Sequence, residues 1–183
     1  MQQGVRRTQL LVWADELFVF LHGSIRRIWA PIGEAIRQRL DVEWGCDRLS
    51  LAVEPIAGSL EWHWIEATGE AGILPIVVAW AEEGIRAVVW DGAPAHTSHR
   101  VRQQAADHAL ALIRQPAHSP ELNPAERVIQ HLRAALEGRV YTTLEEKKSA
   151  VEGVLNELAL DPERVRRLTR WGWIHQAILN LPE

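Results

Sequence analysis

Residues 87–98 read A-V-V-W-D-G-A-P-A-H-T-S, and this stretch decides the fold. A short apolar run of β-branched and aromatic residues ends in Asp91, and a glycine follows at once. Continuous apolar runs of this length are typical of buried strands, and the Gly and Pro residues after it mark a strand exit. The segment therefore predicts an aspartate at the carboxyl end of a central strand.

The second informative stretch, residues 116–132, reads P-A-H-S-P-E-L-N-P-A-E-R-V-I-Q-H-L. Asn123 can cap a helix, Pro124 suits the first helical position, and hydrophobic residues then recur at helical spacing. An acid in the first turn is favoured by the positive end of the helix dipole. A helix is therefore predicted to begin near Asn123 and to carry Glu126, with 34 residues between Asp91 and Glu126.

The rest of the chain predicts strands first, then a β-α-β unit, then helices. Strands are expected at 8–21, 26–31, 49–55, 59–67, 85–90 and 109–113, the last two of the buried type. Helices are expected within 70–83 (with a late start because of Pro75), at 97–107 after Thr97 or Ser98, from Thr142 or Thr143, and from Asp161. The strands across 8–67 read as an antiparallel meander, and the whole as a mixed sheet covered by helices.

Composition excludes several classes of protein. With 183 residues and 47% hydrophobic content, residues 1–183 fit a single globular domain. A net charge of −4 argues against a protein that coats DNA by electrostatics alone, although duplex affinity can reside on a separate domain. Cys46 is the only cysteine, which excludes an intrachain disulfide and a Cys-rich zinc site. No apolar run approaches the about 18 residues of a membrane span, and no signal peptide is evident, so a cytoplasmic location without membrane association is expected.

A third acid, Asp15, interrupts the apolar run at residues 8–21. An acid inside so apolar a strand costs free energy to bury without a partner. Glu16 points to the opposite face, so only one of the two can join a cluster with Asp91 and Glu126. Carboxylates are the ligands that hard cations prefer, and two-metal phosphoryl transfer needs several of them around Mg²⁺ or Mn²⁺ ions roughly 3.5–4 Å apart. The three acids together predict such a site, in a domain that cuts nucleic-acid phosphodiesters.

Each candidate also has a structural explanation. Alone, Asp91 is better explained as part of a turn and Glu126 as a helix-dipole acid. His96 is close enough to Asp91 in the chain to orient a phosphate or shuttle a proton, or else it caps the next helix. The nine tryptophans are expected mainly in the core. The combination of three acids, and none of them singly, carries the functional prediction.

These segments resemble the catalytic domain of mariner-superfamily transposases, in their bacterial insertion-sequence branch. The resemblance rests on V-V-W-D-G-A-P-A-H-T-S and S-P-E-L-N-P-A-E-R-V-I-Q-H-L-R, with support from W-A-D-E-L, R-R-I-W-A-P-I-G-E-A and T-R-W-G-W-I. It implies an RNase H-like α/β fold with a mixed five-stranded sheet and C-terminal helices. It also implies Asp15, Asp91 and Glu126 as catalytic and metal-binding residues for two Mg²⁺ or Mn²⁺ ions, with His96 and Asn123 as auxiliary residues.

The same resemblance implies DNA as partner, both as transposon ends and as target, and action as a homodimer on the nucleoid. Many relatives carry Asn after the second aspartate, where this chain has Gly92. Relatives also begin with helix-turn-helix modules, and only a few residues precede the first predicted strand here. The chain is therefore expected to be the catalytic half alone: a fragment, one frame of a split gene whose partner is a separate helix-turn-helix polypeptide, or a decayed copy. A catalytically silent or domesticated remnant and a stand-alone RNase H-like nuclease are the alternative hypotheses.

Overall fold

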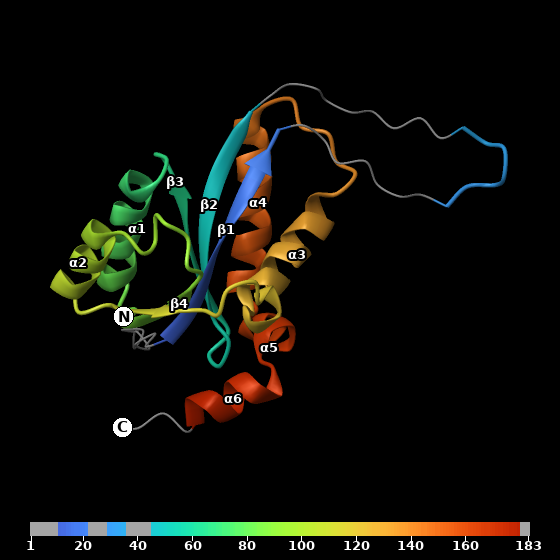
Figure 1. Ribbon diagram of the computed structural model, residues 1–183. Coiled ribbons are helices and arrows are strands. Elements are labelled where there is room, and N and C mark those ends of the chain that lie inside the picture. The colour runs from blue at the N-terminus through green and yellow to red at the C-terminus, as the bar shows by residue number, and fades with distance from the viewer. Residues whose placement is uncertain (1–10, 22–28, 36–44, 180–183) are drawn as a thin grey trace, which may run out of the picture.

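Five strands form one mixed sheet in the order β3-β2-β1-β4-β5 (Figure 1). The computed structural model describes residues 11–21, 29–35 and 45–179. The strands are β1 (Leu11–Phe20), β2 (Cys46–Glu54), β3 (Ser59–Ile65), β4 (Ala87–Trp90) and β5 (Ala111–Arg114). β1 pairs antiparallel with β2, as β2 does with β3, whereas β4 and β5 run parallel to β1. The predicted mixed sheet is confirmed, and the predicted meander is confirmed for three of its four strands.

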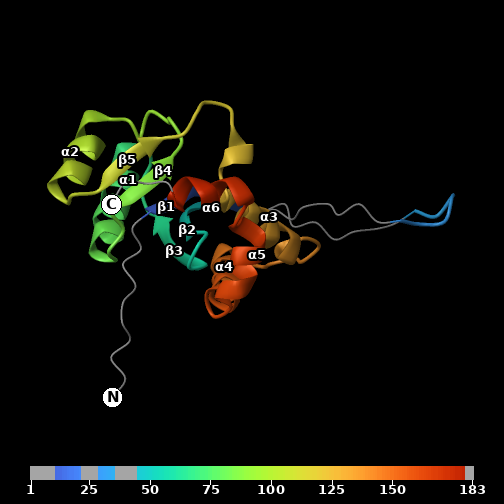
Figure 2. The same cartoon turned by 90° about the horizontal axis from the view of Figure 1, so that it is seen from below.

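Helices cover both faces of this sheet (Figures 1 and 2). α1 (Glu70–Glu82) and α2 (His99–Asp107) pack on one face, and α3 (Ala125–Leu136), α4 (Leu144–Ala159) and α5 (Pro162–Thr169) pack on the other. α6 (Gly172–Leu179) follows α5. Because side chains alternate along a strand, β1 contributes to two cores: Val12 and Ala14 lie in the core under α1, and Leu17 and Val19 lie in the core under α3 and α4.

The strand predicted at 26–31 is wrong where it can be judged. Residues 29–31 are not in a strand, and residues 26–28 lie outside the described part of the chain. Trp29 is 101% exposed and Ile32 is 107% exposed, so neither side chain packs on a core. The sheet's hydrogen bonds on this side run directly from β1 to β2, which leaves no partner for a strand between them.

Two further predictions need correction. α1 begins at Glu70 and contains Pro75, so the proline does not delay its start. The buried face of α1, which includes Ile73, Ile76 and Trp80, outweighs the one hydrogen bond that Pro75 cannot donate. β5 is an exposed edge strand and not a buried one, because only β4 pairs with it.

Two helices were not predicted from the sequence: the short 3₁₀ helix at Pro120–Leu122 and the last helix, α6.

In the described part of the chain, no helix combines the length and the apolar character that crossing a membrane requires.

Candidate functional site

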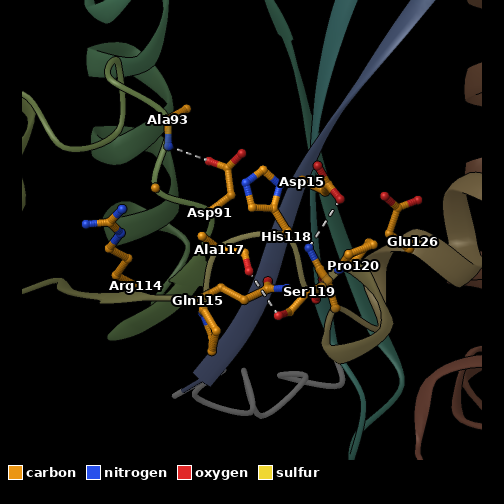
Figure 3. A pocket seen from close by; sticks show the side chains of 13 residues that line it. Asp15, Asp91, Ala93, Arg114, Gln115, Ala117, His118, Ser119, Pro120 and Glu126 are labelled. Carbon is orange, nitrogen blue, oxygen red and sulfur yellow. Dashed lines mark hydrogen bonds between the residues drawn. The ribbon is translucent and has the colours of Figure 1, made fainter.

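A pocket of about 340 Å³ lies beyond the carboxyl end of β4 and beside the start of α3 (Figure 3). Three elements of its wall were predicted from the sequence: Asp15 from β1, Asp91 after β4, and Glu126 from α3. The remainder of the wall comes from residues 92–93, from the loop 114–120 and from Asn123. The structure thus brings all three predicted acids to one cavity.

Asp15 lies near the middle of β1, on the face that α3 covers. Its Oδ1 accepts a hydrogen bond from the backbone N–H of Glu16 at 2.9 Å, and its Oδ2 accepts one from Asn123 Nδ2 at 3.2 Å. Glu16 points to the other face, where its Oε1 accepts from Trp90 Nε1 at 3.1 Å. The prediction that only one of the two neighbouring acids lines the pocket is confirmed.

The pKa of Asp15 is strongly raised. Burial and, after it, the negative charge of Glu126 raise this pKa from 3.8 to about 7. The charges of Glu16 and Asp91 add to the effect, and the hydrogen bond from the Glu16 N–H opposes it. Glu126 and Asp91 are therefore both close enough to Asp15 to disfavour its ionised form. Figure 3 shows Asp15 between the other two carboxylates.

Asp91 is held at the pocket entrance by two donors. Its Oδ1 accepts from the backbone N–H of Ala93 at 3.0 Å and lies 2.5 Å from Nδ1 of His96. The Asp91 side chain is nevertheless 58% exposed, and its Oδ2 makes no hydrogen bond to any described residue. One carboxylate oxygen is thus fixed, and the other remains available to a ligand.

His96 connects Asp91 to Glu16 behind the pocket. The residue is 4% exposed, its Nε2 lies 3.1 Å from Glu16 Oε1, and its ring stacks on Trp90 at 3.7 Å between centroids. Burial lowers the pKa of His96, but the hydrogen bonds and charges of Glu16 and Asp91 outweigh burial and raise it above its ordinary value. The alternative role as a helix cap is wrong, because the hydroxyl of Ser98 caps α2. His96 does not line the pocket and acts on it through Asp91.

Asn123 joins the start of α3 to β1. Its Oδ1 accepts from the backbone N–H of Ala125 at 3.0 Å, so the side chain satisfies a donor of the first turn as predicted, although the residue directly before α3 is Pro124. Its Nδ2 donates to the Ala14 carbonyl at 3.0 Å as well as to Asp15. Since the Asn123 side chain is buried and makes all three bonds, it fixes where α3 begins and hence where Glu126 stands.

The carboxylates suit a hard divalent cation, with one restriction. The site offers carboxylate oxygens, which are the ligands that such a cation prefers. The three acids also repel one another, which contributes to the raised pKa of Asp15, and a bound cation would relieve this repulsion. Among the described residues, however, no three His, Cys, Asp or Glu side chains gather closely enough to hold one metal ion together. Mg²⁺ usually takes only one or two carboxylates and keeps several waters, so pairs of these acids fit it.

Sequence reasoning missed the wall formed by residues 114–120. Gln115 closes this loop, since its Nε2 donates to the carbonyl of Ser119 and its backbone N–H donates to the carbonyl of Trp90 at 2.7 Å. Arg114 lines the pocket at the end of β5. The P-A-H-S-P sequence signals a turn, but nothing in it shows which side chains face the carboxylates.

Comparison with known proteins defines the class of fold. A crystal structure of the mariner Mos1 paired end complex with Mg aligns with a TM-score of 0.70 at 17% identity, over 89% of this chain and 52% of that chain. The catalytic domain of Mos1 mariner transposase aligns at 0.59 and 14% identity, over 89% and 82%. The catalytic core of BIV integrase aligns at 0.52 and 16% identity, over 80% and 81%. The fold is RNase H-like, as expected.

The family follows from the sequence. Residues 10–148 match the family model of the DDE superfamily endonucleases, so the chain belongs to that family. No curated protein matches the sequence. The chain spans little more than half the length of the Mos1 chains in the DNA complexes that it resembles.

Proposed function

We propose that this chain is the catalytic domain of a transposase of the bacterial insertion-sequence branch of the mariner superfamily. The proposed reaction is cleavage of DNA at transposon ends, followed by attack of a 3′-hydroxyl on target DNA. The single observation that carries the proposal is the convergence of Asp15, Asp91 and Glu126 on one pocket in a DDE-family chain. Solved structures of Mos1 with Mn and with Mg support the use of a divalent cation.

The three carboxylates would hold two Mg²⁺ or Mn²⁺ ions, and Asp15 lies between the other two acids. Bound ions of this kind activate an attacking oxygen and stabilise a leaving oxygen. The chain's own part is positional. His96 and Ala93 fix one oxygen of Asp91, and Asn123 fixes both Asp15 and the first turn of α3. Held this way, the carboxylates need little rearrangement when the cations and DNA bind.

The proposed partners are DNA and a second copy of the chain, in the cytoplasm and on the nucleoid. The Mos1 transpososome and the Mos1 paired-end complex with a left transposon end support DNA as the partner. The second copy of the chain follows from the family resemblance alone. Recognition of the transposon ends is assigned to a helix-turn-helix segment outside residues 11–179, on the same or a separate polypeptide.

The proposal is tested by nicking of supercoiled plasmid in the presence of Mn²⁺. The wild-type protein is expected to nick, and replacing Asp15, Asp91 or Glu126 by Ala is expected to slow nicking by roughly 1,000-fold or more, because each change removes a cation ligand. Asp107→Ala, which removes an exposed acid of α2, is the matched control and should nick normally.

Three outcomes would contradict the proposal. Equal nicking by the wild type and Asp91→Ala would show a contaminating nuclease. Absence of both nicking and Mn²⁺ binding by calorimetry would favour a silent remnant. Preferential cleavage of RNA–DNA hybrids over duplex and hairpin DNA would instead favour a stand-alone RNase H-like nuclease.

A further inference from the structure

Arg114 occupies the space in which a side chain of residue 92 would stand. A Cβ built on Gly92 would lie 2.5 Å from Nε of Arg114, 2.7 Å from its Nη2 and 2.9 Å from its Cζ. These separations are shorter than a Cβ contact allows, so the guanidinium packs directly on the Gly92 backbone. Glycine at this position therefore seats Arg114 beside the turn that follows Asp91.

The sheet brings Arg114 to this position. β4 and β5 are parallel neighbours, and Arg114 is paired with Trp90, the residue before Asp91. Both Arg114 and Asp91 line the pocket, and Figure 3 shows the guanidinium on the side of Asp91 that faces away from Asp15 and Glu126. The arginine thus belongs to the rim of the cavity that contains the three acids.

The Arg114 guanidinium has no partner among the described residues. It is exposed, and it forms neither a hydrogen bond nor an ion pair there, not even with Asp91. Five N–H donors in a planar fork match the oxygens of a phosphate, and a guanidinium keeps its charge at any working pH. The three carboxylates of the pocket repel a polyanion such as a nucleic acid, and the positive charge of Arg114 at the rim offsets part of this repulsion.

We propose that Arg114 binds a phosphate of the DNA strand next to the phosphate that is cut. Gly92 allows this because it leaves room for the Arg114 guanidinium. The inference rests on the proposed function, because it names how this same pocket holds DNA. A DNA backbone is the ligand favoured here, since adjacent phosphates allow one to contact Arg114 while the next faces the carboxylates.

The test is a double-mutant cycle on DNA binding. Affinity for a fluorescent DNA duplex with a single-stranded flap is measured by anisotropy across salt concentrations, with Ca²⁺ in place of Mg²⁺. Arg114→Ala is expected to weaken binding about tenfold and to reduce the slope of log affinity against log salt by about one. Gly92→Ala is expected to have a similar effect, because its new methyl group displaces the guanidinium, the flexible end of a long side chain.

The combined variant separates this inference from a general charge effect. If Gly92→Ala acts only through Arg114, it adds almost nothing in the Arg114→Ala background. Two controls are matched to the variants: Gly153→Ala, where an added Cβ meets nothing within 4 Å, and Arg102→Ala, which removes an exposed arginine of α2. Both controls should bind DNA as the wild type does, and thermal melts should show all variants folded.

Unchanged affinity and salt slope in Arg114→Ala would overturn the inference, as would additive effects of the two changes or the absence of DNA binding by the wild type. The binding assay needs no cleavage, so the two proposals can fail separately. Arg114-dependent binding without nicking would refute the proposed activity alone. Nicking with Arg114-independent binding would refute this inference alone.

Discussion

Among the acids that the structure describes, Asp15 is the one whose ionisation the fold opposes most strongly. Its pKa is raised from 3.8 to about 7 by burial and by the charges of Glu126, Glu16 and Asp91. Between these two pH values the folded chain binds a proton that the unfolded chain has lost, so stability falls as pH rises from about 4 to 7. A difference of one pKa unit between the folded and unfolded chain changes the free energy of unfolding by about 1.4 kcal/mol, so Asp15 alone lowers it by up to roughly 4 kcal/mol.

The raised pKa of Asp15 gives the first prediction. The metal-free protein is expected to melt at a higher temperature at pH 5 than at pH 8, and Mg²⁺ or Mn²⁺ should remove most of the difference. Binding of the cation at pH 6 should release close to one proton, as measured by calorimetry in buffers of different ionisation enthalpy. Asp107→Asn, on the exposed side of α2, should release the same amount. If cation binding at pH 6 released no proton, Asp15 would not be a protonated group that the cation deprotonates.

Asn123 gives the second prediction at this scale. Asn123→Ala removes the donor to the Ala14 carbonyl and to Asp15, and it leaves the Ala125 N–H without its acceptor. Since Asn123 is 3% exposed, water cannot replace these bonds freely, and a loss of about 2–4 kcal/mol is expected in urea unfolding. Asn156→Ala, at an exposed position of α4, is the matched control and should change stability by less than about 0.5 kcal/mol. A loss in Asn123→Ala no larger than in this control would refute the linking role.

At the scale of elements, local patterns predicted what depends on near neighbours. Ser98, Thr143 and Asp161 all cap the helices that their sequences signal, because capping involves residues two or three positions away. The bonds from Asn123 to β1 cross more than 100 residues and leave no local signal. For the same reason β5 was misjudged, since a short apolar run does not show whether one strand or two will pair with it.

α1 shows how tertiary packing overrides a local rule, and it gives the third prediction. Pro75 lies inside the helix and on its exposed side, where it cannot donate to the carbonyl of Ala71. Pro75→Ala restores this donor and should raise the free energy of unfolding by about 1–2 kcal/mol. The gain is smaller than the full cost of an interior proline, because the substitution also gives the unfolded chain more conformational freedom. Urea unfolding measures the change. Destabilisation by Pro75→Ala would mean that the ring itself packs in a way that stabilises the fold.

At the scale of the whole molecule, the family match and the folded unit do not end at the same residue. The match to the DDE superfamily endonucleases ends at residue 148, inside α4. Beyond it, Val151, Leu155, Leu158 and Val165 are completely buried in the core between the sheet and α3. That same core sets the position of α3 and therefore of Glu126. The C-terminal helices are thus part of what builds the site.

A chain that stops at residue 148 is accordingly expected not to fold cooperatively. Each of the four buried side chains contributes about 1.5–3 kcal/mol, and their sum is comparable with the total stability of a typical domain. Circular dichroism during urea titration should show no sharp transition for residues 1–148, whereas residues 1–179, which keep α4, α5 and α6, should unfold as the complete chain does. A cooperative transition for residues 1–148 within about 2 kcal/mol of the complete chain would mean that the sheet with α1, α2 and α3 is stable without the core formed by α4 and α5.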